Sequence, residues 1–263
     1  MSRVFAIANQ KGGVGKTTTA INLAAALAAN DLRVLVIDSD PQGNATTGLG
    51  VAKSPDRLSM YDILLGDSPS AEAIVPTDFE GLHLIPADKS LVGANLEMVD
   101  RPNREFRLRE RIAELRESYA FVLIDCPPAL DLLTLNALVA ADSVLVPIQC
   151  EFFALEGISE LMDTIDRIRE GLHHPLKVEG ILLTMYDDRT NLTRQVEADL
   201  REFFVGQVFR TTIPRSIRLA EAPSFGKTIL SYDPRSRGAE SYIQLAKEIL
   251  HHEQSRKSPQ GAR

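Results

Sequence analysis

The chain has 263 residues and a net charge of −7. Its length allows a sizeable buried core and favours a single α/β domain. No apolar run reaches the roughly 18–20 residues that cross a bilayer. The strand-like pattern begins by residue 4, leaving no room for a signal peptide, and there are only two cysteines. We therefore expect a cytoplasmic protein in which any nucleic-acid binding comes from a local basic patch rather than from overall charge.

The first predicted strand, 4–8, leads into a glycine-rich turn and then into an Ala- and Leu-rich helix, 19–28. This order is typical of a phosphate-binding loop, whose backbone N–H groups face an anion at the positive end of the helix dipole. Lys16 would reach the β- and γ-phosphates, and the Thr17 hydroxyl would be a ligand of Mg²⁺. The expected nucleotide contacts are Lys11, Gly12, Gly13, Val14, Gly15, Lys16, Thr17 and Thr18.

This loop departs from the usual pattern G-x-x-x-x-G-K-[ST]. Gln10 stands where the first glycine belongs, and a second lysine, Lys11, follows it. The alternative is a glycine-rich turn with incidental lysines. Because several specified positions coincide between a strand and a helix, a nucleotide site is the better interpretation.

Acidic residues end two further predicted strands. The strand 33–37 is followed by Asp38 and Asp40, and the strand that begins at Phe121 ends in Asp125. Ligands of open α/β sheets gather at the carboxyl ends of strands, so these carboxylates should lie beside the phosphate loop. Asp125 has the form of a Walker B residue, which holds Mg²⁺ usually through water. The alternative for Asp38 and Asp40 is a solvated strand end with acidic turn residues.

The rest of the chain alternates between helical and strand patterns. Helices are predicted over 59–65, 71–75, 104–117, 130–140, 155–170 and a segment ending at 203, and strands over 82–86, 143–148, 178–184 and 208–213. This alternation implies an α/β fold with a doubly wound, mostly parallel sheet flanked by helices. We expect one domain over residues 1–253 and a polar, disordered tail over 254–263.

The loop Lys11-Gly-Gly-Val-Gly-Lys-Thr-Thr resembles the deviant Walker A motif of the ParA/MinD family of ATPases. Together with Asp40-Pro-Gln-Gly-Asn, the segment 149–157 and the segment 213–239, it resembles the chromosomal ParA/Soj partition ATPases over nearly the entire chain. The resemblance implies a deviant P-loop NTPase fold that hydrolyses ATP with Mg²⁺. It also implies a partitioning ATPase that forms an ATP-dependent homodimer.

The resemblance assigns roles to individual side chains. Lys11 would cross the dimer interface to the nucleotide of the other subunit, and Asp40 would orient the attacking water. The implied catalytic residues are Lys11, Lys16 and Asp40; the implied metal ligands are Thr17, Asp38 and Asp125; and the implied base contacts are Pro214 and Ser216.

Double-stranded DNA, bound without sequence specificity, and a ParB-type centromere-binding protein that stimulates hydrolysis are the partners that the resemblance implies. The protein would then associate with the nucleoid. The candidate DNA contacts are Arg189, Arg215, Arg218 and Arg235, with Lys247 a weaker candidate. The alternative is that these arginines pair with carboxylates close by, such as Asp187, Asp188, Glu221 and Asp233.

Three other functions use related scaffolds. A MinD-like membrane-associated ATPase would need an amphipathic C-terminal helix, which we do not expect here because the end of the chain has too little apolar face. A dethiobiotin-synthetase-like ligase would need a substrate pocket of its own. A redox ATPase would need an iron–sulfur cluster, but Cys126 and Cys150 are better interpreted as buried structural thiols.

Overall fold

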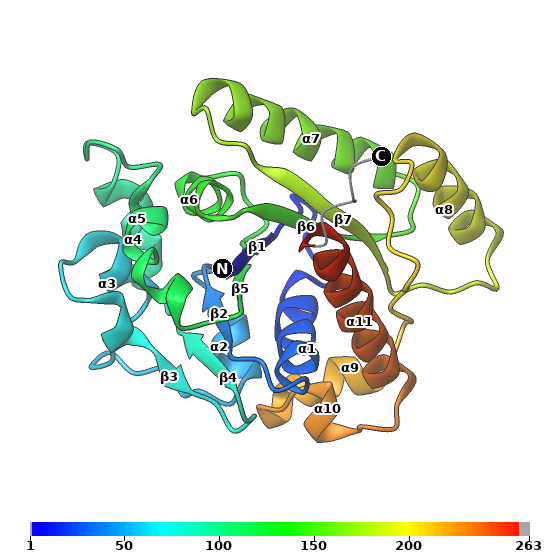
Figure 1. Ribbon diagram of the computed structural model, residues 1–263, viewed down its shortest axis with the longest axis horizontal. Helices are drawn as coiled ribbons and strands as arrows, with labels where there is room; N and C mark the ends of the chain where they lie inside the picture. The colour runs from blue at the N-terminus through cyan, green and yellow to red at the C-terminus, as the bar shows by residue number, and fades with distance from the viewer. Residues whose placement is uncertain (1, 258–263) are drawn as a thin grey trace.

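The computed structural model describes residues 2–257, which form a seven-stranded sheet with the order β3-β4-β2-β5-β1-β6-β7 (Figure 1). All neighbouring strands are parallel except the short pair β3–β4. The doubly wound, mostly parallel fold is therefore confirmed. The strands are β1 (Arg3–Ile7), β2 (Val34–Asp38), β3 (Val75–Pro76), β4 (Leu82–Ile85), β5 (Phe121–Asp125), β6 (Ser143–Gln149) and β7 (Lys177–Thr184).

Helices cover both faces of the sheet, and each face has its own apolar core. In β1, Phe5 and Ile7 face one core while Val4 and Ala6 face the other, as the alternation of a strand requires. The first core lies under α1 (Lys16–Ala28), α2 (Asn44–Gly48), α9 (Ile217–Glu221), α10 (Ile229–Tyr232) and α11 (Arg237–Lys257). The second lies under α3 (Met60–Leu65), α4 (Leu91–Glu97), α5 (Arg107–Arg111), α6 (Leu132–Ala140), α7 (Ala154–Gly171) and α8 (Asn191–Phe203).

The predicted strand 208–213 is wrong in the described structure. The segment runs along β7 but forms only isolated bridges, Val208 with Ile181 of β7 and Pro214 with Tyr186 just beyond the end of β7. Between these points, the backbone N–H groups of Arg210 and Thr211 donate to the Glu248 carboxylate of α11, at 2.8 and 3.1 Å. The Glu248 side chain thus accepts from backbone N–H groups that would donate to the neighbouring strand in a regular β-ladder.

Three predicted boundaries also differ. The predicted helix 104–117 is divided into α5 and the 3-10 turn η2 (Glu114–Glu117). Asn136 of α6 accepts from Leu108 N at 3.1 Å near the start of α5, and after Ile112 the backbone bonds tighten to the i→i−3 pattern of a 3-10 turn, with Leu115 N donating to Ile112 O at 3.0 Å. The predicted helix 71–75 is the 3-10 turn η1 (Ser70–Ala73). The predicted tail begins at residue 254, whereas α11 continues to Lys257; residues 258–263 lie outside the described residues.

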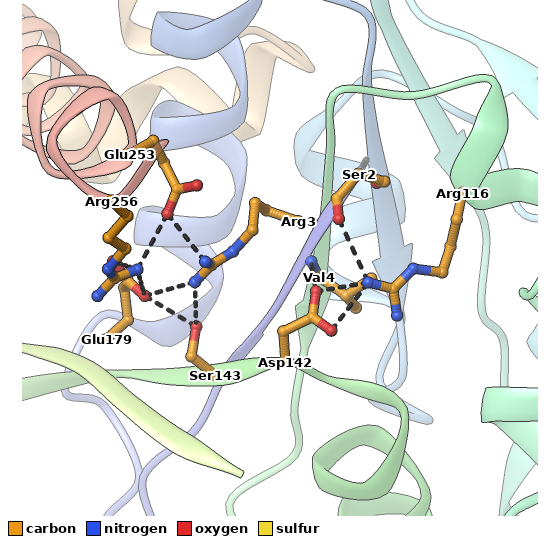
Figure 2. Close-up of polar contacts among 9 residues, drawn as sticks. All are labelled: Ser2, Arg3, Val4, Arg116, Asp142, Ser143, Glu179, Glu253 and Arg256. Carbon is orange, nitrogen blue, oxygen red and sulfur yellow. Dashed lines mark hydrogen bonds and ion pairs between the residues drawn. The ribbon is translucent and has the colours of Figure 1, made fainter. Parts of the chain in front are cut away.

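A closed ring of four charges fastens the end of α11 to the edge of the sheet where β1, β6 and β7 begin (Figure 2). Arg3 and Arg256 each contact both Glu179 and Glu253, with N···O distances of 2.9 to 3.0 Å. The Glu179 side chain is fully buried, and Ser143 also donates to it at 2.9 Å. Such a carboxylate is tolerated only because every neighbour supplies a donor or a positive charge.

We predict that Glu179→Gln lowers the free energy of unfolding by about 2–4 kcal/mol, because it leaves two guanidinium groups facing a neutral amide. Urea unfolding measures the change. Glu170→Gln, on the exposed face of α7, is the matched control and should shift the midpoint little. Equal midpoints for the two variants would show that the ring contributes nothing to stability.

Candidate functional site

The loop between β1 and α1 closes around the Lys16 side chain. Gly13 and Gly15 adopt left-handed backbone conformations, with φ of 75° and 87°, which other residues adopt only with strain. Lys16 Nζ donates to the backbone carbonyl of Lys11 at 2.9 Å, and Lys16 is buried. Burial lowers the pKa of Lys16, while the Asp125 carboxylate nearby opposes that shift. The loop therefore holds an ammonium group in a shape suited to surround an anion.

Neighbouring strands hold this loop in place. The Asn9 side chain donates to the carbonyl of Pro147 in β6 at 2.8 Å, and the Thr184 hydroxyl at the end of β7 donates to the carbonyl of Val14 at 2.8 Å. No side chain caps the N-terminus of α1. The first N–H groups of this helix are therefore left for a ligand, as in phosphate sites.

Asp38 and Asp125 lie side by side at the ends of β2 and β5, as their paired register requires. Asp125 is fully buried, and neither of its carboxylate oxygens has a hydrogen-bond partner. Burial raises the pKa of Asp125 well above its usual range, and the charge of Asp38 adds to this; the Thr17 hydroxyl lies close enough to oppose it without forming a hydrogen bond. Two orphaned oxygens in this position fit a hydrated Mg²⁺ ion.

The neighbouring carboxylates are occupied by the loop that follows β2. One Asp38 oxygen accepts from Thr46 twice, from its N at 2.8 Å and its hydroxyl at 2.7 Å, and the other accepts from Asp40 N at 3.2 Å. Burial raises the pKa of Asp38, and these donors oppose the shift. Asp40 is buried and accepts from Gln42 N at 2.9 Å. Asp38 thus anchors the loop that carries Asp40.

A pocket of about 330 Å³ adjoins the phosphate loop. Pro214 and Ser216 line it, together with Gly15, Thr18 and Tyr242. The Tyr242 hydroxyl lies 3.2 Å from that of Thr19, so α11 and α1 meet at this pocket. The structure therefore brings the two predicted base contacts beside the predicted phosphate contacts, in a hollow of the size that small ligands occupy.

Lys11, the unusual second lysine, extends outward from the loop. Its ammonium group forms an ion pair with Glu151 of the same chain, and both side chains are exposed, at 40% and 44%. Glu151 follows β6, and sequence reasoning did not single it out. Thr46, Thr184 and Asn9 were missed as well. Asn9 and Thr184 lie at the ends of predicted strands, and this position could have identified them as candidate site residues.

The four predicted DNA contacts divide into two classes. Arg189 pairs with Asp187 at 2.6 Å, and Arg218 pairs with Glu221 at 3.1 Å and with Asp233 at 3.6 Å. Arg189 and Arg218 therefore form the local ion pairs that the alternative interpretation expects. Within residues 2–257, the exposed Arg215 and Arg235 form no ion pair.

Both cysteines are buried free thiols, as predicted. Burial raises the pKa of Cys150 to about 11, so it is a poor thiolate ligand. Across the described part of the chain, no group of three or more His, Cys, Asp or Glu side chains could hold a metal ion. An ion at Asp125 would therefore take its other ligands from a hydroxyl, a phosphate and water, which is the usual pattern for Mg²⁺.

A family model described as an AAA domain matches residues 2–178. The chain is 52% identical to the chromosome partitioning protein ParA of Myxococcus xanthus, over 95% of this chain and 88% of that protein. It is 51% identical to the sporulation initiation inhibitor protein Soj of Bacillus subtilis, over 95% and 98%. The chain belongs to the ParA/Soj family of chromosome-partitioning ATPases. The family resemblance of its sequence motifs is thereby confirmed.

Two solved structures similar to this ParA/Soj family member have the same fold, and one of them contains ADP and magnesium. A Mycobacterium smegmatis protein titled cobyrinic acid a,c-diamide synthase, with bound ADP and magnesium, has a TM-score of 0.84 and 39% identity over 98% of this chain and 97% of that one. The cell division ATPase MinD of Pyrococcus furiosus has a TM-score of 0.79 and 28% identity over 96% and 100%. Nucleotide and magnesium binding are thus found in this fold. No helix within residues 2–257 is both long and apolar enough to cross a membrane.

We predict that Thr184→Val weakens Mg-ATP binding by roughly five- to tenfold, because the loop carbonyl of Val14 loses its donor. Thr184→Ser keeps the hydroxyl and should restore most of the affinity. Titration of both variants with a fluorescent ATP analogue measures the effect. Equal affinities for the valine and serine variants would show that the hydrogen bond does not position the loop.

Proposed function

We propose that this protein is a Mg²⁺-dependent ATPase that hydrolyses ATP to ADP and phosphate in order to switch its own binding to DNA. The observation that carries the proposal is the conjunction of three features at one edge of the sheet. A buried Lys16 lies in a loop that leads into a helix with no side-chain cap, Asp125 has two unpartnered oxygens near it, and the pocket of Pro214 and Ser216 adjoins the same loop at Gly15.

The side chains of this site suit phosphoryl transfer, which depends on positioning and charge stabilisation more than on covalent chemistry. Lys16 and the free amides of α1 would bind the phosphates. Asp40, held at the edge of the loop by Gln42 N and Asp38, would orient the attacking water. When bound, Mg²⁺ would screen the phosphate charge, held by Thr17 and Asp125 with Asp38 beside them.

We further propose that ATP joins two copies of the chain face to face. Lys11 is exposed and already paired with Glu151, so it can reach another subunit's nucleotide only by leaving that partner. Phe152 and Phe153 follow Glu151 and are 78% and 63% exposed. Two adjacent exposed aromatic rings beside a charged pair are typical of a surface that another protein covers. These features support Lys11 as the residue that crosses the interface.

DNA binding and partner stimulation complete the proposed cycle. Arg215 and Arg235, which have no ion-pair partner among the described residues, can contact phosphates directly, whereas Arg189 and Arg218 must first exchange their carboxylate partners. Pairing of two copies doubles this patch, so a protein of net charge −7 would bind DNA only as the ATP dimer. Hydrolysis, stimulated by a ParB-type centromere-binding protein, would then release the dimer from the nucleoid.

Small-molecule metabolism on the same scaffold is the second candidate. The Mycobacterium smegmatis structure whose title names a cobyrinic acid a,c-diamide synthase favours it. Its identity to this chain is 39%, whereas the identities of the partitioning relatives are 47–53% over nearly the whole chain. Partitioning is therefore the better supported proposal.

The proposal is tested by measuring phosphate release with ATP alone, with DNA, and with DNA plus the N-terminal peptide of a ParB-type protein. We expect slow basal turnover that both additions stimulate, and Asp40→Ala should abolish release while retaining an ATP dimer. The small-molecule alternative predicts turnover that neither DNA nor the peptide changes. That result, or full phosphate release by Asp40→Ala, would overturn the proposal.

For Lys11→Ala we predict loss of the ATP-dependent dimer and a fall in turnover of roughly 10²-fold, because a charge aimed at the partner's phosphates is removed. ATP binding by the monomer should be nearly unchanged. Gel filtration with ATP and equilibrium nucleotide titration measure the two effects. Lys89→Ala, an exposed lysine elsewhere, is the control. A normal dimer for Lys11→Ala would exclude the role across the interface.

A further inference from the structure

The side chain of Thr46 lies in a buried polar cluster behind the loop 39–43. Thr46 belongs to α2 and is fully buried. Its hydroxyl donates to Asp38 Oδ2 at 2.7 Å, and its backbone N–H donates to the same oxygen at 2.8 Å. The hydroxyl oxygen also accepts from the backbone N–H of Ala87 at 3.0 Å. One hydroxyl thus uses both its donor and an acceptor in a part of the molecule that solvent does not reach.

These bonds join three segments of the chain. Asp38 ends β2, Thr46 belongs to α2, and Ala87 follows β4. Because β2 and β4 are paired neighbours in the sheet, their ends lie side by side without help from a side chain. The helix α2, by contrast, returns to this edge of the sheet only after the loop 39–43. Through its hydroxyl, Thr46 therefore bonds the far end of that loop to the end of β2 and to the turn after β4.

Asp38 extends the same cluster to Asp40. The second Asp38 oxygen, Oδ1, accepts from Asp40 N at 3.2 Å. Asp40 in turn accepts from Gln42 N at its Oδ1, at 2.9 Å, and from Gly43 N at its backbone carbonyl, at 2.8 Å. Asp40 Oδ2 has no hydrogen-bond partner within residues 2–257. The loop thus fixes one oxygen of Asp40 and leaves the other free to accept from a water molecule.

The outer side of the loop packs against the turn that Thr46 contacts. A Cβ at Gly43 would lie 2.6 Å from the carbonyl oxygen of Ala87, which is closer than a side chain tolerates. The Ala87 N–H meanwhile donates to the Thr46 hydroxyl. The turn after β4 therefore contacts the loop at Gly43 and α2 at Thr46. Any shift of this turn relative to α2 changes the space that the loop occupies.

The hydroxyl can be removed while the rest of the cluster remains. Asp38 would keep its bonds from Thr46 N and Asp40 N, so its carboxylate would stay partly satisfied. Ala87 N would lose its acceptor, and a buried N–H group without a partner is costly. We therefore expect the turn after β4 to move away from α2 and the loop between them to loosen. The loss is local, because the apolar cores on the two faces of the sheet are untouched.

From these contacts we propose that Thr46 is a positioning residue for ATP hydrolysis: its hydroxyl, acting through Asp38, holds Asp40 where that carboxylate can orient the attacking water. The inference rests on the proposed hydrolysis of ATP and adds a residue outside the predicted nucleotide and metal contacts. It also separates the tasks of two adjacent carboxylates. Both oxygens of Asp38 are occupied by the loop and α2, whereas both oxygens of Asp125 are free. Asp38 therefore holds the loop, and Asp125 is left to serve a cation.

The test measures phosphate release by the full chain with Mg-ATP, DNA and the N-terminal peptide of a ParB-type protein, and separately the affinity for a fluorescent ATP analogue. Thr46→Val keeps the branched shape without the hydroxyl, so kcat should fall roughly 10²-fold while affinity stays within about twofold. Thr46→Ser keeps the hydroxyl and should restore most of the turnover. Thr47→Val is the matched control, because the Thr47 hydroxyl is on the exposed side of α2 and donates only to Gly43 O. Its turnover should be unchanged.

Amide hydrogen exchange of the nucleotide-free chain gives a second readout that does not depend on catalysis. In Thr46→Val, the amides of Gly43 and Ala87 should exchange roughly tenfold faster, which corresponds to the net loss of one buried hydrogen bond. Amides of the phosphate loop should exchange at the rate of the unmodified protein. Thr46→Cys has a similar size and a weaker donor, so its exchange and turnover should be intermediate. It carries the test if the valine variant does not fold.

Equal turnover of Thr46→Val and Thr47→Val would overturn the proposal. Equal losses in the valine and serine variants would do the same, because packing rather than the hydroxyl would then be responsible. A fall in ATP affinity as large as the fall in kcat would assign Thr46 to nucleotide binding and reject a positioning role. An unmodified protein without turnover would overturn the proposed function. The exchange measurement would then decide the role of Thr46 alone, and unchanged exchange at Gly43 in the valine variant would reject it.

Discussion

The structure depends on charges buried at the carboxyl ends of β1, β2 and β5. Lys16 and Asp125 lie in a region where an uncompensated charge is costly, and the fold supplies only part of the compensation from its own atoms. The loop carbonyl of Lys11 serves Lys16, while Asp125 lacks any hydrogen-bond partner. A ligand that brings negative phosphates and a cation satisfies both residues at once. Such a ligand would therefore relieve an energetic cost that the fold leaves uncompensated at Lys16 and Asp125.

At the end of the sheet where β1, β6 and β7 begin, the buried charges are instead paired with one another within the chain. There Arg3, Glu179, Glu253 and Arg256 balance one another's charges in a closed ring of ion pairs, which holds the end of α11. Nearer its other end, α11 brings Tyr242 to the pocket lined by Pro214 and Ser216. The helix α11 is thus held by ion pairs near its C-terminal end and lines the pocket with Tyr242 nearer its N-terminal end.

Much of this arrangement could be predicted from sequence. The phosphate loop, Asp38 and Asp125 follow apolar runs, and the rule that ligands gather at strand ends places them together. Long-range partners could not be predicted, because nothing in the local sequence indicates that Thr184 donates to Val14 or that Lys11 pairs with Glu151. The segment 208–213 was predicted wrongly for the same reason. Its β-like composition is local, whereas Glu248, which diverts its N–H groups, comes from a helix far along the chain.

The irregular segment 208–213 determines how the sheet ends beside β7. A parallel sheet with a bare outer strand exposes N–H and C=O groups on which a foreign strand could assemble. Beside β7 that position is held by a chain too irregular to accept a further neighbour, since Glu248 occupies its amides at Arg210 and Thr211. At the other margin, β3 is two residues long and contains Pro76, which has no amide hydrogen to donate. Both margins are thus closed to sheet extension, and the molecule is protected against edge-to-edge aggregation.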